Sequence, residues 1–480
     1  MKPLRTLFSF WLFSSLLLTV PSDAAAISIL EEQKLAKQFM AMVEKQNALM
    51  EDPIVVHMVR QVGIHLLRNI SNQPFEYHFY VVNEDVFNAF AAPGANIFFY
   101  RGLITSLESV DEFAGIVSHE IAHAASRHVS ESIDRAKYVN FGTLAGILAG
   151  AIIGSNSGGN AGATIAQGAL ALGQTAMLAY TRENETEADE KGIMFLKQSC
   201  FKPEGLLSGL MKIRNADFRG VEKIPEYVKT HPGTGNRVAH IESILSTYKP
   251  SGTPLPCPDN LRFDMVKYRL LGLYTEIDKA EKILTDALKE DDSNAAVHYG
   301  LGLLYERKFL SDKAMAHLRK GLAINVFDPM ILLEMGRLYL SDRAPDKALQ
   351  VLSGLETDPV VGVMARFYQA SANLELRNLS KARIGFNSVI NKIPSFYPQA
   401  YLKLANVYSL EKNTGMSAYH LGHYYHLIKK DKTAKVHLNR ALATLSDEKT
   451  REKAEALLKK IEKKKSPVKP ANTSPRRPRR

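Results

Sequence analysis

The chain has 480 residues, 45% of them hydrophobic and 23% charged, which is the composition of an ordinary globular protein with roughly two or three domains. The net charge is +11, but residues 451–480 hold 12 Lys and Arg against 3 Glu, so the rest of the chain is close to neutral. A protein that binds nucleic acid more often has a basic folded surface, so we expect no nucleic-acid partner.

Residues 1–26 have the pattern of a secretory signal peptide. Lys2 and Arg5 give a positive start, residues 7–20 are apolar, and residues 22–26 offer a small-residue cleavage site. An uncleaved anchor is the alternative, but the apolar run is shorter than the roughly 18–20 residues that span a bilayer. We therefore expect an exported protein.

The segment up to residue 101 predicts two helices followed by two strands. Residues 27–69 place apolar side chains at helical spacing and are interpreted as two helices. Residues 75–82 and 97–101 are rich in aromatic and β-branched side chains, which favours strands, with a turn at Pro93-Gly94 between them. The second strand could accept an extended peptide by strand addition, or it could simply be a sheet edge.

Residues 119–123 read His-Glu-x-x-His. Ser109 and Glu112 have the spacing of a capping box, which predicts a helix beginning there. Residues i and i+4 share a helix face, so His119 and His123 can bind one metal ion, and imidazole suits zinc. Glu120 can act as a general base on a water molecule. The alternative is a surface helix that happens to carry two histidines.

A glycine-rich segment, residues 141–175, follows this helix. It alternates small and apolar residues around a polar turn, and neither apolar half is long enough to span a membrane. We interpret it as a helical hairpin over the active site, either a mobile lid or a tightly packed element without a gating role.

A zinc site with two histidines needs a further donor. His128 lies nine residues after His119, which places it on the opposite face of the helix. Glu185 and Asp189 are again i and i+4 on a predicted helix, so one carboxylate can complete a His₂Glu site while the other accepts a ring N–H of a ligand histidine. Taken alone, this acidic run would be interpreted as a solvated helix face.

The two cysteines, Cys200 and Cys257, lack the C-x-x-C spacing of a zinc site. In an oxidising compartment they could pair and tether the end of one domain to the following linker. They could equally stay separate thiols, because the sequence does not give their distance.

Four motifs in this order resemble the zinc peptidase family of HtpX and the CAAX prenyl proteases: residues 88–94, residues 119–123, residues 185–189, and Thr230-His231-Pro232 with Arg237. With the export signal and the repeats described below, the chain is similar to periplasmic members that act on misassembled outer-membrane β-barrel proteins. One departure is Ala95, where the family usually has a second Gly after Pro-Gly.

The resemblance implies a role for each residue of the site. It implies that His119, His123 and Glu185 are the zinc ligands, that Glu120 is catalytic, and that Asp189 supports the site or donates a proton. It also places His231 and Arg237 near the oxyanion of the substrate, where cationic donors lower the barrier. A second possibility is that His231 occupies the open zinc position and blocks water until substrate arrives.

The C-terminal half contains a repeat. Small residues recur as equally spaced pairs, Gly302 with Ala314, Gly336 with Ala348, and Ala370 with Ala382. The pairs follow one another at the period of tetratricopeptide repeats, about 34 residues, in which small residues lie where paired helices touch. A generic helical bundle is the alternative. Such solenoids present a concave surface for peptides or partner proteins.

We therefore predict a mainly α protein. Its expected parts are a signal peptide (1–26), an α+β zinc peptidase domain with a small sheet and the H-E-x-x-H helix (27–249), a linker (250–260), an α-helical tetratricopeptide solenoid (261–447), and a charged helix with a disordered basic tail (448–480). The tail could contact an anionic membrane surface or could simply aid solubility.

The predicted function is that of an endopeptidase of the periplasm with one Zn²⁺ per chain. The resemblance implies that its substrates are unfolded or misassembled outer-membrane proteins. The repeats would recruit them or bind the outer-membrane β-barrel assembly machinery, and the protein would also assist folding as a chaperone does. The alternative is a chaperone or scaffold without proteolytic activity. Glu120 argues against it, because a scaffold needs no base beside a metal ion.

Overall fold

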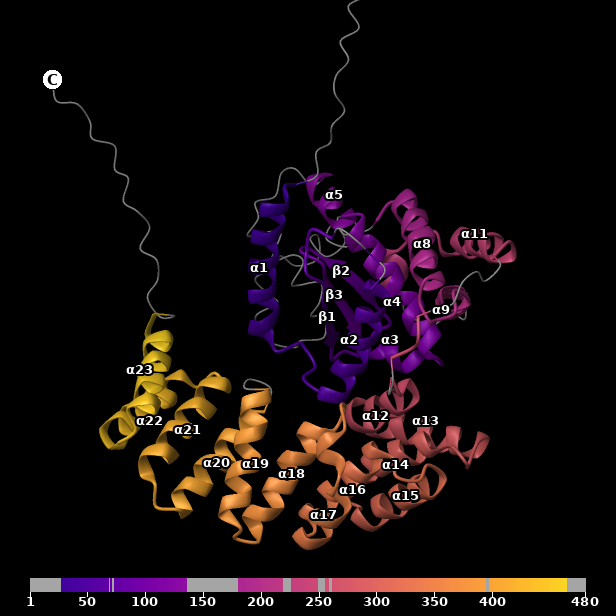
Figure 1. The fold of residues 1–480 in the computed structure, drawn as a ribbon. Coiled ribbons are helices and arrows are strands. Elements are labelled where there is room, and N and C mark those ends of the chain that lie inside the picture. The colour runs from indigo at the N-terminus through magenta and orange to yellow at the C-terminus, as the bar shows by residue number, and fades with distance from the viewer. Residues whose placement is uncertain are drawn as a thin grey trace, which may run out of the picture.

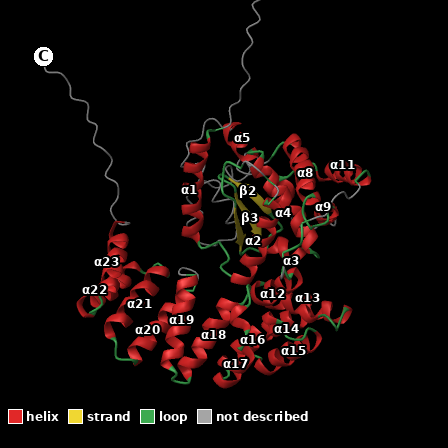
Figure 2. Cartoon of the chain, in the orientation of Figure 1, coloured by secondary structure: helices red, strands yellow, loops and turns green. Residues whose placement is uncertain are grey.

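A computed structural model describes residues 27–68, 70, 73–135, 180–218, 226–248, 255–258, 261–393 and 397–463. The predicted signal peptide, the glycine-rich segment 141–175 and the tail 466–480 lie outside these residues. The N-terminal part surrounds a small sheet, and the C-terminal part is an arc of helices beside it (Figures 1 and 2). The predicted fold class is therefore confirmed, while the domain boundaries stay a prediction.

Two helices open the described chain, as predicted. Helix α1 (Ile29–Gln46) begins at Ser28, which forms a reciprocal capping box with Glu31. Helix α2 (Pro53–Leu67) begins at Asp52, whose carboxylate accepts hydrogen bonds from the backbone N–H groups of Ile54 and Val55.

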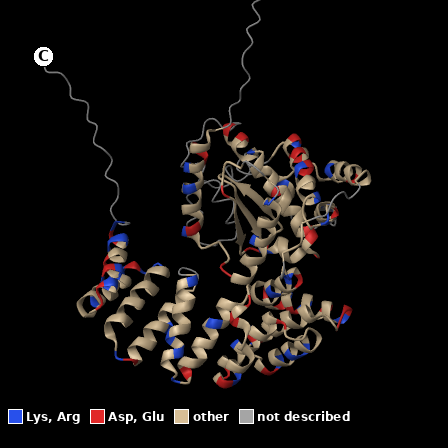
Figure 3. Ribbon diagram, in the orientation of Figure 1, with Lys and Arg blue, Asp and Glu red and all other residues tan. Residues whose placement is uncertain are grey.

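The sheet has three strands in the order β1-β3-β2: β1 (His78–Val82), β2 (Ala89–Ala92) and β3 (Asn96–Tyr100). Strand β1 is parallel to β3 with His78 opposite Asn96, and β2 is antiparallel to β3 with Ala92 opposite Asn96. None of the residues in these three strands is an acid, a lysine or an arginine (Figure 3). Strand β3 is fully buried.

This arrangement corrects the prediction for the strand that precedes the H-E-x-x-H helix. Strand β3 is paired on both sides, so it is neither a sheet edge nor free to accept a peptide. The outer strand on one side of the described sheet is β2, a strand that the sequence does not predict. Its four residues are Ala-Phe-Ala-Ala, and alanine is depleted in strands.

The helices around the sheet build the rest of the N-terminal part: α3 (Arg101–Ser106), α4 (Val110–Ala125), α5 (His128–Arg135), α8 (Arg182–Lys197), α9 (Glu204–Phe218), α10 (Glu226–Thr230) and α11 (Thr234–Ser246). Helix α4 packs against α8 and α9 and against the sheet. Phe99 of β3 and Phe113 of α4 are fully buried, with ring centroids 5.2 Å apart. The core therefore fixes α4 on the sheet.

A disulfide joins Cys200 and Cys257. Cys200 follows α8, and Cys257 lies in the segment before the first helix of the repeats. Of the two alternatives that the sequence left open, the paired form is the one in the structure.

The arc consists of antiparallel helices: α12 (Phe263–Tyr274), α13 (Ile277–Glu290), α14 (Ala295–Arg307), α15 (Ser311–Ile324), α16 (Pro329–Ser341), α17 (Pro345–Leu352), η1 (Leu355–Thr357), α18 (Gly362–Glu375), α19 (Leu379–Lys392), α20 (Pro398–Leu410), α21 (Thr414–Leu427), α22 (Asp431–Thr444) and α23 (Glu448–Lys463). The repeat also appears in the backbone. Phe309, Arg343 and Arg377 recur with the same period as the small residues, and all adopt positive φ of 58° to 61° in the turn after the first helix of a pair.

Among the described residues, the contacts between the arc and the N-terminal part include one at α12 and one at the α21–α22 turn. At α12, the buried guanidinium of Arg269 pairs with Asp52 and with Glu334 of α16. Farther along, Lys429 in the α21–α22 turn donates to the carbonyl of Glu44 and the side chain of Asn47 at the end of α1. Among the residues that the structure describes, no helix is long and apolar enough to cross a membrane.

Candidate active site

Helix α4 carries the H-E-x-x-H residues. The side chain of Ser109 accepts from the backbone N–H of Glu112, but Glu112 accepts from the N–H of Glu108 and not from Ser109, so only half of the predicted capping box forms. The side chains of His119, Glu120 and His123 are fully buried. The helix is therefore enclosed, and the alternative of a surface helix with two histidines is wrong.

Helix α8 carries the two predicted carboxylates. It begins at Thr181, which forms a reciprocal cap with Asn184. Glu185 and Asp189 are fully buried and face α4. One oxygen of Glu185 lies 3.5 Å from Nε2 of His119, and the other lies 3.4 Å from Nε2 of His123. The i, i+4 spacing on each helix thus brings four side chains of the site together.

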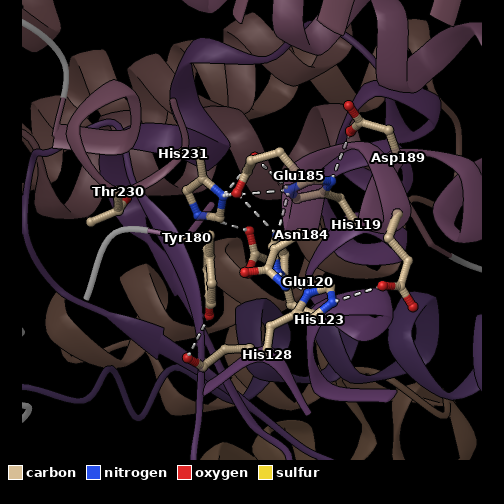
Figure 4. A network of polar contacts seen from close by, with 12 residues as sticks. His119, Glu120, His123, His128, Tyr180, Asn184, Glu185, Asp189, Thr230 and His231 are labelled. Carbon is tan, nitrogen blue, oxygen red and sulfur yellow. Dashed lines mark hydrogen bonds and ion pairs between the residues drawn. The ribbon is translucent and has the colours of Figure 1, made fainter. Parts of the chain in front are cut away.

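A fourth donor joins the cluster from the turn after α10. Nδ1 of His231 lies 3.0 Å from Glu185 and 3.4 Å from Nε2 of His119. One ligand atom from each of His119, His123, Glu185 and His231 lies within 4.8 Å of the others, and all four residues are buried. Figure 4 shows these side chains converging. One metal ion can therefore be held by side chains of α4, of α8 and of the loop at His231, which are far apart in the sequence.

Asp189 and Arg237 lie behind the cluster. Nδ1 of His119 is 2.9 Å from Asp189, and the guanidinium of Arg237 donates two hydrogen bonds of 2.7 Å to that carboxylate. Arg237 also lies 2.5 Å from Glu185. The structure thus brings both predicted residues to the site, and it places Arg237 between the two carboxylates.

These contacts set the charge states. Burial raises the pKa of Asp189, but Arg237 outweighs it and brings the value down to about 2. Burial and Arg237 lower the pKa of His119, but the hydrogen bonds to Asp189 and Glu185 outweigh them and raise it to about 9. An imidazole supported by carboxylates is a strong base and hence a good metal ligand once a metal ion displaces its proton.

Glu120 has a different environment. Among the described residues, neither of its carboxylate oxygens has a hydrogen-bond partner, and Nε2 of His231 lies 3.6 Å from one of them. Complete burial raises the pKa of Glu120 above its usual value, against the opposing effect of His231. A buried carboxylate without partners is costly unless something in the site uses it. These properties suit a general base.

His128 does not lie where its spacing from His119 predicts. That spacing predicts the opposite face of the helix, but α4 ends at Ala125 and Arg127 adopts a positive φ of 56°. This turn brings Nδ1 of His128 to 2.9 Å from Nδ1 of His123. His128 does not reach the donor cluster, so it is not a ligand candidate, but it lies directly behind one.

Two tyrosines were not identified from the sequence. The ring of Tyr180 stacks on His123 with centroids 3.9 Å apart, and the ring of Tyr227 stacks on His231 at 4.2 Å. Both tyrosines are buried. Tyr180 directly precedes the Thr181 cap and Tyr227 lies four residues before His231, so position next to a motif was the available signal.

Comparisons with known proteins bear on the whole site. Residues 54–245 match the model of peptidase family M48. The chain is 26% identical over 325 residues to the beta-barrel assembly-enhancing protease of Yersinia pestis, and 25% identical over 325 residues to the protein of that name from Escherichia coli strain K12. Each match covers 68% of this chain and 64% of the relative. The mitochondrial metalloendopeptidase OMA1 of Homo sapiens is 25% identical over 239 residues, covering 48% of this chain and 44% of that protein.

The chain thus spans less than two thirds of the length of these relatives. Among solved structures, the type IV pilus biogenesis factor PilW is 19% identical, with 38% of this chain and 85% of that chain covered at a TM-score of 0.32, which is too low to carry an argument. The family match runs from α2 to α11 and includes every residue of the donor cluster. Residues 54–245 of this chain, with all four donors of the cluster, are thus similar to peptidase family M48.

Proposed function

We propose that this chain is an exported zinc-dependent endopeptidase that degrades misassembled proteins of the cell envelope. One observation carries the proposal: four buried metal-ligating side chains converge, and beside them lies the carboxylate of Glu120 with no hydrogen-bond partner among the described residues. A structural metal site would not need such a carboxylate, whereas hydrolysis of a peptide needs a base at that position.

The donor set fits zinc. Two donors bound to one tetrahedral zinc ion at about 2.0–2.1 Å lie about 3.3 Å apart. The neighbouring donor atoms of the cluster are separated by 3.0 to 3.5 Å. We infer that His119, His123 and Glu185 hold the ion, one per chain. When bound, Zn²⁺ supplies a Lewis acid and lowers the pKa of water.

The remaining residues handle protons and orientation. Glu120 accepts a proton from the attacking water and passes it to the leaving amine, a task that its raised pKa suits. Asp189 accepts the Nδ1–H of His119 and so keeps Nε2 free for the ion. Arg237 holds both carboxylates in place. Its role at the substrate oxyanion stays a prediction. The contacts that the guanidinium makes in this structure are with Glu185 and Asp189.

His231 would regulate access. Its Nδ1 lies among the other donors, and Tyr227 stacks against its ring. A catalytic zinc site keeps its fourth position open for water or substrate. This geometry supports the blocking role for His231 over the oxyanion role, with the imidazole leaving the cluster when substrate enters.

The disulfide and the relatives support a location and a class of substrates. The Cys200–Cys257 disulfide favours an oxidising compartment, which agrees with export to the periplasm. The relatives are named for enhancing β-barrel assembly. We propose that the helical repeats recruit misassembled outer-membrane proteins or the β-barrel assembly machinery, since such arcs present extended binding surfaces.

A chaperone or scaffold without proteolytic activity is the second candidate. The observation that favours it is the closed donor set, in which His231 takes the place that a catalytic zinc leaves open. Such a protein would bind unfolded envelope proteins through the repeats alone, and its metal ion would only stabilise the fold.

Metal analysis combined with casein cleavage separates the two candidates. We expect purified protein to hold one zinc per chain, and Glu120→Gln to retain that zinc while losing about 10²- to 10⁴-fold in cleavage rate. Removing zinc with a chelator should abolish cleavage, and adding Zn²⁺ back should restore it. Equal cleavage by wild type and Glu120→Gln would reject the peptidase mechanism.

A further inference from the structure

The two candidate histidine ligands of α4 are supported in different ways. Nδ1 of His119 lies 2.9 Å from the carboxylate of Asp189. Nδ1 of His123 lies 2.9 Å from another imidazole, that of His128, whose Nε2 is 3.3 Å from Glu187. His123 therefore reaches a carboxylate, that of Glu187, only through His128, which lies between the two.

Metal binding by His123 determines where the protons lie along the contacts from His123 through His128 to Glu187. Nε2 of His123 faces the donor cluster, so a neutral His123 that binds a metal ion carries its proton on Nδ1. That N–H can donate only if Nδ1 of His128 is the acceptor. A neutral His128 then carries its own proton on Nε2, which donates to Glu187. Each ring has one proton, and every nitrogen in the chain has a partner.

The backbone places His128 for this purpose. The positive φ of Arg127 ends α4 and begins α5 at His128. Arg127 is held there because its guanidinium pairs with the buried Glu32 of α1, which also accepts from Ser130. The side chain of His128 is 1% exposed. Its position is thus fixed from both sides of the turn.

The far end of the chain of contacts is anchored as well. Glu187 lies on α8, two residues after Glu185, and accepts hydrogen bonds from Lys191 and Ser126. Its side chain is 46% exposed, in contrast to the buried Asp189. The same helix that provides a ligand therefore also provides the support for a second one.

We propose that His128 is a positioning residue that links His123 to Glu187 and thereby fixes the tautomer and orientation of His123 for the metal ion. The proposal rests on the metal binding assigned to this site above. Outer partners of ligating histidines typically change metal affinity about 10- to 100-fold when they are removed.

The test compares two substitutions of His128, one that keeps the contact with His123 and one that keeps the contact with Glu187. His128→Asn keeps an acceptor close to the position of Nδ1, and His128→Gln keeps a polar group only at the Nε2 end. Competition with a chromophoric chelator gives the affinity for Zn²⁺. We expect His128→Gln to weaken Zn²⁺ binding about 10- to 100-fold and His128→Asn to stay within about threefold of wild type.

Glu187→Ala tests the contact between His128 and Glu187. Because Glu187 is half-exposed, this variant still gives an answer if the variants of the buried His128 do not fold. It should weaken Zn²⁺ binding severalfold. The matched control is Glu190→Ala on the same helix, because Glu190 also pairs with a histidine, His240, at 3.0 Å but is not linked to a ligand through it. This control should bind as wild type does.

Two outcomes would overturn the proposal: equal affinities for His128→Asn and His128→Gln, or equal affinities for Glu187→Ala and Glu190→Ala. Both are measured against a wild type that binds Zn²⁺. A wild-type protein that binds no Zn²⁺ would instead reject the proposed function, and this inference with it, so the two failures are distinguishable.

Discussion

Nδ1 of His231 lies 3.0 Å from the carboxylate of Glu185, although the two residues are 46 positions apart in the sequence. The same nitrogen lies 3.4 Å from Nε2 of His119, so the ring completes a set of four donors. These two contacts bear directly on whether the donor cluster at rest is open or closed to water and substrate.

Replacing His231 tests this relationship. If the imidazole blocks the fourth position, His231→Ala should raise the rate of casein cleavage severalfold, because water and substrate then reach the site without displacing a ligand. If the imidazole stabilises the oxyanion, the same change should lower the rate about 10²- to 10³-fold. Zinc content is measured in parallel, so that a loss of metal is not mistaken for a loss of catalysis. An unchanged rate at full zinc occupancy would reject both roles.

The parts of the site that depend on residues close together in the sequence were predictable, and the parts that depend on packing between distant elements were not. The spacing of His119 and His123 and of Glu185 and Asp189 is local, because a helix fixes the direction of residues four apart. That both pairs meet depends on the packing of α4 against α8, which no spacing gives. The motif order, through its family resemblance, supplied that step.

The wrong predictions concern backbone turns and a short strand that have no clear sequence pattern. The interpretation of His128 assumed that α4 continues, but a left-handed residue without glycine, Arg127, ends it. Strand β2 is short and alanine-rich, so its sequence does not predict a strand. Ala95, the one departure from the family pattern, does adopt the left-handed conformation with φ 55°. The repeats were predictable because a fixed period along the chain can be read without any knowledge of packing.

The contact between the arc and α2 should be a large contributor to stability. Asp52 caps α2 with one carboxylate oxygen and binds Arg269 and Tyr274, each at 2.8 Å, with the other. Asp52→Ala leaves the Arg269 guanidinium buried without this partner, which typically costs about 3–5 kcal/mol. Urea unfolding measures the loss. The control is Asp286→Ala, whose solvent-exposed pairs with Lys282 and Lys289 should contribute little to stability. Similar losses in both variants would contradict the prediction.

The small residues of the repeat should be sensitive to a single methyl group. A Cβ at Gly336 would lie 2.5 Å from Cγ of the fully buried Leu352 on the paired helix. We expect Gly336→Ala to lower the free energy of unfolding by about 1–3 kcal/mol through overpacking. Gly235 is the matched control, because it is also helical and a Cβ added there would meet nothing within 4 Å. Gly235→Ala should be neutral or stabilising by up to about 1 kcal/mol. A neutral Gly336→Ala would show that the paired helices can separate at little cost.

A buried histidine should make the end of the arc sensitive to acid. His420 of α21 is 3% exposed, stacks on Tyr408 with centroids 5.3 Å apart, and has no hydrogen-bond partner for either ring nitrogen among the described residues. Burial lowers the pKa of His420 from 6.5 to about 3. Because the folded value lies below the unfolded one, the unfolded state binds more protons between these two pH values, so stability is fully present above pH 6.5 and falls as the pH drops toward 3.

The change is measurable as a difference in pH dependence. One such group should cost about 2 kcal/mol between pH 7 and pH 5, since each unit of pKa difference corresponds to about 1.4 kcal/mol. His420→Phe keeps the stacked ring and removes the titrating group. Between pH 7 and pH 5, the free energy of unfolding of this variant should therefore fall by about 2 kcal/mol less than that of the wild type. His240→Asn, at an exposed position on α11, is the control and should follow the wild-type curve. Parallel curves for wild type and His420→Phe would mean that the ring of His420 gains a proton without leaving its place between the helices.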